Sequence, residues 1–279
     1  MFAIKIPIFP FHIWLPEAHV EAPTVGSVVL AGLLLKLGGY GILRFLFMFV
    51  EAGRYFQPFV VTLCLLSVWI ASIMAIGQVD IKKIIAYSSI AHMNFALLGI
   101  FSHTLFGVLG GIVLFVSHGF VSSSLFLLVG VLYDRHHSRS VYKYSGLSTV
   151  MPVFSVIFFF FIISNFSFPG TSNFVGELLV FLGLGGSGHF LTLIFAGIST
   201  VCTVVYSLLL YNKLSFGSPS YAEITTYTDI TRREFFLFLP LIFINFAIGL
   251  SPNIVLVLVE SVTLDIMWPE YITPSITNS

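Results

Sequence analysis

Four ionisable side chains lie inside long apolar runs, where burying a charged group costs free energy. They are Lys36 in LLLKLGG, His92 in SIAHMNF, His118 in FVSHGFV and Glu177 in FVGELLV; Lys5, in AIKIP, lies near the start of the chain. A charge at the centre of a bilayer costs about 2.5–3.5 kcal/mol, so such residues are functional hypotheses by default. One ionisable group per helix, at comparable depth, is what a lateral proton relay requires, because bridging waters can link the side chains.

The three residue types suit proton transfer in different ways. Histidine gains and loses a proton near neutral pH, lysine can give up its proton when it is desolvated, and glutamate supplies the opposing charge. One alternative is structural: hydrogen bonds to neighbouring serines for the histidines, or an ion pair for Lys36 or Glu177. In a second alternative, His92 and His118 are the axial ligands of a haem, but this function would not explain Lys36 and Glu177.

Two further groups of polar residues have a weaker claim to function. The first precedes an apolar run and predicts a helix start at the membrane surface, with proton uptake as the alternative; it comprises Asp80, Lys82 and Lys83. The second flanks a proline-rich stretch and either lines a polar funnel or makes ordinary loop contacts; it comprises His12, Glu17, His19 and Glu21.

The composition predicts a membrane protein rather than a soluble domain. Of 279 residues, 57% are hydrophobic and only 9% are charged, far from the composition of soluble domains. Twelve basic residues balance twelve acidic ones, with no polybasic tract, which argues against nucleic acid as a partner. The two cysteines, Cys64 and Cys202, lie in separate apolar runs. We therefore expect no disulfide framework, cysteine-bound metal or iron–sulfur cluster in this chain.

Membrane-crossing helices must position the ionisable side chains. Hydrophobic length and turn residues predict crossings at about 24–49, 57–77, 84–101, 106–132, 190–212 and 235–259. Residues 152–186 stay apolar too long for one straight crossing, and Pro169-Gly170 should break them, so we expect one discontinuous helix. Counting this region as a single crossing also gathers most loop lysines and arginines on one side of the membrane.

The amino end is a second interrupted segment, because four prolines punctuate residues 1–23. Two broken segments in one apolar chain are typical of transporters built from inverted repeats. We therefore expect an all-α polytopic membrane protein with one transmembrane domain over residues 1–259. Residues 213–234 are predicted to form a surface connector, and residues 260–279 a polar tail.

Four stretches carry a family resemblance: PFHIWLPEAHVEAPTVGSVVLAGLLLKLGGYGILRF, DIKKIIAYSSIAHMN, SHGFVSSSLFLLVGVLYDR and FPGTSNFVGELLVFLG. In order over roughly residues 4–260, the chain resembles the subunit 4 family of respiratory NADH:ubiquinone oxidoreductase, complex I. The likeness to this family is closer than to the paralogous subunits 2 and 5, or to subunits of multi-subunit sodium/proton antiporters.

The resemblance implies an antiporter-like helix bundle with discontinuous helices, the second half of an inverted-repeat fold of about fourteen helices. It also implies a proton-translocating subunit of an enzyme, NADH:ubiquinone reductase, that holds no redox site, cofactor or metal of its own. By matching motifs, Lys5, Lys36, His92, His118 and Glu177 correspond to the proton-relay axis of the family. The alternatives are a subunit of a monovalent cation/proton antiporter and a purely structural membrane subunit.

The resemblance also sets expectations for partners and location. Other membrane-arm subunits of complex I and lipids are the expected partners, and the mitochondrial inner membrane is the expected location. The first half of the family fold, including the glutamate that pairs with the lysine matched by Lys5, has no counterpart in this sequence. Either the chain is incomplete or the missing half is a second polypeptide. Since Lys5 alone would be an uncompensated charge, we expect a separately encoded amino-terminal fragment that packs against residues 1–30.

Overall fold

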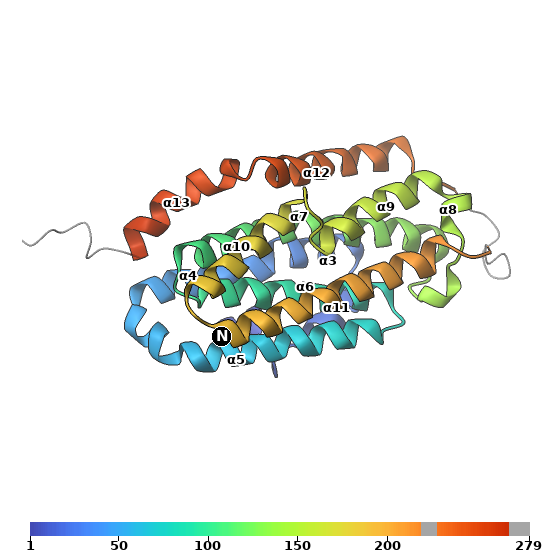
Figure 1. The fold of residues 1–279 in the computed structure, drawn as a ribbon. Coiled ribbons are helices and arrows are strands. Elements are labelled where there is room, and N and C mark those ends of the chain that lie inside the picture. The colour runs from blue at the N-terminus through green and yellow to red at the C-terminus, as the bar shows by residue number, and fades with distance from the viewer. Residues whose placement is uncertain (219–227, 268–279) are drawn as a thin grey trace, which may run out of the picture.

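The computed structural model describes residues 1–218 and 228–267, and these fold into a bundle of helices (Figure 1). Pairing of extended backbone in the described residues is limited to one isolated bridge between Asp80 and Ser140. Six helical stretches are long and apolar enough to cross a membrane: Thr24–Leu46, Val50–Gly77, Ile81–Ile100, Leu105–His136, Phe190–Ser215 and Arg232–Leu250. The chain is a multi-pass membrane protein, and the predicted all-α fold is confirmed.

The helices follow one another along the chain as α1 (Phe2–Lys5), α2 (Trp14–Glu21), α3 (Thr24–Val29), the π-helical turn η1 (Leu30–Leu34), α4 (Leu35–Met48), α5 (Val50–Ile76), α6 (Ile81–Ile100), α7 (Leu105–His136), the short turn η2 (Val141–Lys143), α8 (Leu147–Val150), α9 (Pro152–Asn165), α10 (Ser172–Gly186), α11 (Phe190–Ser215), α12 (Arg232–Leu250) and α13 (Asn253–Met267). The predicted crossings at 24–49, 57–77, 84–101, 106–132 and 190–212 each fall on one of these helical stretches.

Helices α6 and α7 form the centre of the bundle. Almost every residue of α6 is buried, because α5, α7 and α10 pack around it. Helices α12 and α13 run along one outer edge (Figure 1). Large side chains on α12, such as Phe236 and Phe243, are exposed, as expected on a face that meets lipid or another subunit.

The discontinuous helix predicted at 152–186 is present. Its first half, α9, ends at Asn165, and its second half, α10, begins at Ser172. Asn245 of α12 joins the two halves: its Oδ1 accepts hydrogen bonds from the backbone N (3.1 Å) and Oγ (2.5 Å) of Ser172, and its Nδ2 donates to Ser164 Oγ at 2.6 Å. Irregular backbone at membrane depth requires such partners within the protein.

The amino end is interrupted as predicted, with irregular backbone between α1 and α2. Two side chains from neighbouring helices hydrogen-bond to this backbone. Asn94 Nδ2 donates to the carbonyl of Pro7 at 3.0 Å, and Ser67 Oγ accepts from the backbone N of Phe9 at 2.7 Å. The neighbouring helices α5 and α6 therefore hold the break in place.

The crossing predicted at 235–259 is present as Arg232–Leu250, but its predicted end is too late. Helix α12 ends at Leu250, and α13 begins at Asn253, because Pro252 has no backbone N–H to continue the first helix. Helix α13 continues past residue 260, where the polar tail was expected to begin, and residues 268–279 lie outside the described part of the chain. The expected connector at 213–234 is described only at its two ends, because residues 219–227 are likewise outside.

Candidate functional site

Lys36 lies at the second residue of α4, directly after the π-helical turn η1. Its Nζ donates a hydrogen bond to the Ala31 carbonyl at 2.5 Å and lies 2.9 Å from His118 Nδ1 on α7. Gly32 favours this close approach of α7, because a Cβ there would lie 2.8 Å from Ser123 Oγ in its present position. The ammonium group and the imidazole are therefore within direct proton-transfer distance.

His118 is followed by a second histidine and a carboxylate. The rings of His118 and His92 have centroids 5.5 Å apart and are tilted by 43°, and both side chains are buried. His92 Nδ1 lies 3.3 Å from Glu177 Oε1 on α10, and Glu177 is only 6% exposed. Four helices thus assemble Lys36, His118, His92 and Glu177, in that order, into what we call the relay row.

The position of Glu177 depends on close packing of α10 against α7. At the contact between these helices, a Cβ on Gly183 would lie 2.4 Å from the Cα of Gly107. No side chain fits there without separating the helices. The two glycines therefore permit the approach that brings α10, and with it Glu177, to the central helices.

Lys5 is the one predicted relay residue that the structure leaves outside the relay row. Its side chain is exposed on α1, and α1 packs against α4 near Gly38. The Lys5 ammonium group makes no hydrogen bond or ion pair with any residue that the structure describes. Its place in a relay remains a prediction.

The polar residues around the first break divide into two pairs. Glu17 and Glu21 are exposed, whereas His12 and His19 are buried, at 7% and 0% exposure. The His19 ring stacks on Phe126 with a centroid distance of 4.4 Å. Among the described residues, neither ring nitrogen of His19 has a hydrogen-bond partner. The histidines thus face the protein interior, while the carboxylates face outward.

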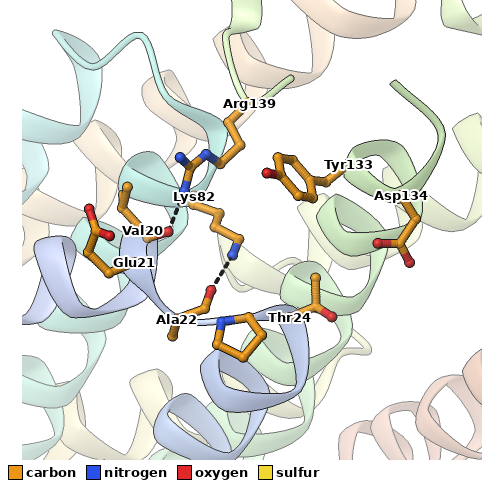
Figure 2. Close-up of a pocket in the computed structure, with 9 residues that line it drawn as sticks. Val20, Glu21, Ala22, Thr24, Lys82, Tyr133, Asp134 and Arg139 are labelled. Carbon is orange, nitrogen blue, oxygen red and sulfur yellow. Dashed lines mark hydrogen bonds between the residues drawn. The ribbon is translucent and has the colours of Figure 1, made fainter. Parts of the chain in front are cut away.

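Lys82 lies at the start of α6, as the sequence predicted, beside a polar cavity of about 370 Å³. Its Nζ donates to the Ala22 carbonyl at 2.9 Å, and Arg139 donates to the Val20 carbonyl. Figure 2 shows both cations reaching the end of α2, across the cavity from Asp134. Lys82 therefore binds a helix-end carbonyl, as expected for a cation near a helix C-terminus. A role in proton uptake here remains the alternative.

Two buried polar residues, on α10 and α11, were missed by the sequence analysis. Asn173 precedes Glu177 by four residues, on the same face of α10, and Tyr206 lies on α11; they are 0% and 2% exposed. Only the spacing of Asn173 from Glu177 could have signalled this environment. A cavity of about 240 Å³ borders Glu177 on another side, with Ser167 and Thr200 in its lining.

Comparison with known proteins identifies relatives over almost the whole chain. A family model described as "NADH:quinone oxidoreductase/Mrp antiporter, TM" matches residues 1–203. NADH-ubiquinone oxidoreductase chain 4 of Chondrus crispus is 52% identical over 253 residues, which is 90% of this chain and 51% of the relative. The Marchantia polymorpha protein of the same name is 50% identical over 256 residues, 91% of this chain and 52% of the relative. The chain thus spans about half the length of the curated relatives it matches.

Solved structures share this fold. A chain of respiratory complex I from Thermus thermophilus with bound NADH superposes with a TM-score of 0.84 at 28% identity, covering 95% of this chain and 56% of that one. A chain of the Mrp complex from a Dietzia species has a TM-score of 0.88 at 21% identity, covering 96% of this chain and 58% of that one. The antiporter-like bundle predicted from the sequence is therefore confirmed.

Proposed function

The chain belongs to the NADH:quinone oxidoreductase/Mrp antiporter family of transmembrane subunits, and we propose that it translocates protons as a membrane-arm subunit of an NADH:ubiquinone oxidoreductase. The observation that carries this proposal is the relay row. Ammonium, imidazole and carboxylate groups from four helices meet inside the protein, where unpaired charges are costly and are kept for function. The relatives near 50% identity support the redox enzyme as the setting.

The contacts of the row suggest the path of a proton. Lys36 donates its proton to His118 Nδ1, and His118 then releases the proton on its Nε2 toward His92. His92 in turn passes its Nδ1 proton to Glu177 Oε1. Both Nε2 atoms are buried without a hydrogen-bond partner among the described residues, so a water between the rings can link them.

Charge at each end of the row controls the transfer. A protonated His92 is stabilised by the Glu177 carboxylate 3.3 Å away and is repelled when Lys36 and His118 are also charged. A positive charge arriving beside Glu177 would weaken the attraction between the Glu177 carboxylate and protonated His92. His92 would then release its proton. We propose that protons are taken up from the side with the basic loops and leave near Glu177. The energy comes from redox chemistry in other subunits.

Further parts of the proposal concern the surroundings of the chain. We propose that it binds no redox cofactor or metal, that membrane-arm subunits and lipids cover its exposed apolar faces, and that it resides in the mitochondrial inner membrane. The chain 4 proteins of eukaryotic NADH-ubiquinone oxidoreductases among the relatives support this location. The separately encoded fragment expected next to residues 1–30 remains a prediction.

Replacing Lys36 with methionine tests the proposed function, because methionine keeps a long side chain but removes the proton donor. We expect the enzyme complex to assemble, and proton translocation per NADH oxidised to fall in sealed membrane vesicles. Lys213→Met is the matched control, since Lys213 is exposed at the end of α11. Normal translocation by an assembled Lys36→Met complex would disprove the relay. Cation-driven proton movement without NADH would instead favour an antiporter.

A further inference from the structure

The polar cavity of about 370 Å³ beside Lys82 lies outside the relay row, where α2 and α7 end and α6 begins (Figure 2). Two cations and two carboxylates line it: Lys82, Arg139, Glu21 and Asp134. None of these four side chains forms an ion pair with another residue that the structure describes. The cavity therefore keeps opposite charges apart around a space in the size range of small-molecule sites.

The two cations keep hydrogen-bond donors for a ligand. Lys82 Nζ donates to the Ala22 carbonyl at 2.9 Å, and Arg139 donates to the Val20 carbonyl. A lysine ammonium or an arginine guanidinium can donate several hydrogen bonds, and the described residues take up only one from each. Both cations reach the same side of the cavity (Figure 2). Together they suit an oxygen-rich anion such as a phosphate group.

The opposite side of the cavity suits a cation. Asp134 is exposed there, across from Lys82 and Arg139 (Figure 2), and Glu21 adds a second carboxylate to the lining. Because two positive and two negative side chains balance, the lining complements a zwitterion better than a simple anion. A phosphate joined to an ammonium group by a short linker satisfies both sides at once.

The cavity lies at the level of lipid headgroups. Lys82 is the second residue of α6, and Asp134 lies in the last turn of α7, so both are at ends of membrane-crossing helices. Exposed apolar side chains come close to this point. Val79 is 42% exposed, and its carbonyl accepts a hydrogen bond at 2.9 Å from the segment that carries Arg139; Ile76, at the end of α5, is 40% exposed. A headgroup in the cavity can therefore have its acyl chains on lipid-facing surface.

We propose that this cavity binds the headgroup of phosphatidylethanolamine, with the phosphate against Lys82 and Arg139 and the ammonium toward Asp134. The ethanolamine ammonium can donate hydrogen bonds to a carboxylate. The trimethylammonium group of phosphatidylcholine cannot, and phosphatidylglycerol has no cation. The site does not depend on the proposed proton translocation.

Photochemical labelling tests this proposal. The probe is phosphatidylethanolamine with a diazirine on one acyl chain, added to the delipidated, assembled complex. Mass spectrometry then measures the labelling of the peptide that contains Val79. We expect unlabelled phosphatidylethanolamine to compete at least about tenfold better than phosphatidylcholine, phosphatidylglycerol or soluble ethanolamine phosphate, since one hydrogen bond to a charged group has about this effect.

Two variants identify the groups that hold the lipid. Lys82→Met should lower the labelling about tenfold. Lys83→Met is the matched control, because the neighbouring lysine does not line the cavity. Asp134→Asn, at an exposed position, should remove the preference for phosphatidylethanolamine over phosphatidylglycerol, and it decides the question should Lys82→Met fail to assemble.

Three results would overturn the proposal. The first is labelling of Lys82→Met equal to that of Lys83→Met, and lower proton translocation by Lys82→Met alone would then favour proton uptake at this site. The second is equal competition by phosphatidylglycerol in the unaltered complex. The third is equal competition by soluble ethanolamine phosphate, which would assign the cavity to a free phosphate compound instead of a lipid.

Discussion

Replacing Glu177 with glutamine removes the charge at the end of the relay row while keeping the size of the side chain. Glutamine can still accept a hydrogen bond from His92 Nδ1, so α10 should stay in place. The change removes the buried anion itself. Leaving a buried anion without its partner would destabilise the protein more. We therefore expect normal assembly and a loss confined to proton translocation.

The expected size of the effect follows from the geometry. His92 Nδ1 and Glu177 Oε1 are 3.3 Å apart. At an effective dielectric constant of about 20, opposite unit charges at this distance attract each other by about 5 kcal/mol. Since about 1.4 kcal/mol corresponds to a tenfold change, the loss of this attraction should slow proton transfer through His92 by about three to four orders of magnitude. Proton transfer through His92 should then be too slow to support translocation.

The assay is proton translocation per NADH oxidised, measured in sealed vesicles with the assembled complex. Glu51→Gln is the control, since Glu51 is exposed near the start of α5. A double-mutant cycle with His92→Gln measures the coupling directly. If the effects of His92→Gln and Glu177→Gln on translocation are simply additive, or if Glu177→Gln translocates normally, the electrostatic argument is wrong.

Two further predictions concern the packing that holds the row. Asn245→Ala should lower the free energy of unfolding by about 1–3 kcal/mol, because it leaves the buried N–H of Ser172 without its acceptor; thermal unfolding in detergent measures this. Gly183→Ala should cost about 1–3 kcal/mol as α10 is pushed away from Gly107. In the same unfolding assay, Gly186→Ala should have little effect, because a Cβ at Gly186 would meet no atom within 4 Å. Equal stability of both glycine variants would contradict the packing argument.

Local features of the sequence predicted most of the fold. Each crossing is a continuous apolar run, and hydrophobic length is a property of the run itself. The break at Pro169-Gly170 was equally local, because proline and glycine disrupt a helix wherever they occur. The break before α13 carried the same kind of signal in Pro252, yet the apolar residues on both sides concealed it.

What only the tertiary structure decided is which ionisable groups meet. The sequence by itself determined that Lys36, His92, His118 and Glu177 lie in membrane helices. Their order depends on the rotation and spacing of helices far apart in the chain, which contacts such as that between α7 and α10 set. The same packing places Lys5 at an exposed site and buries Tyr206 within the bundle. Neither result could be read from the sequence, because burial in a bundle depends on the neighbouring helices as well as on the residue.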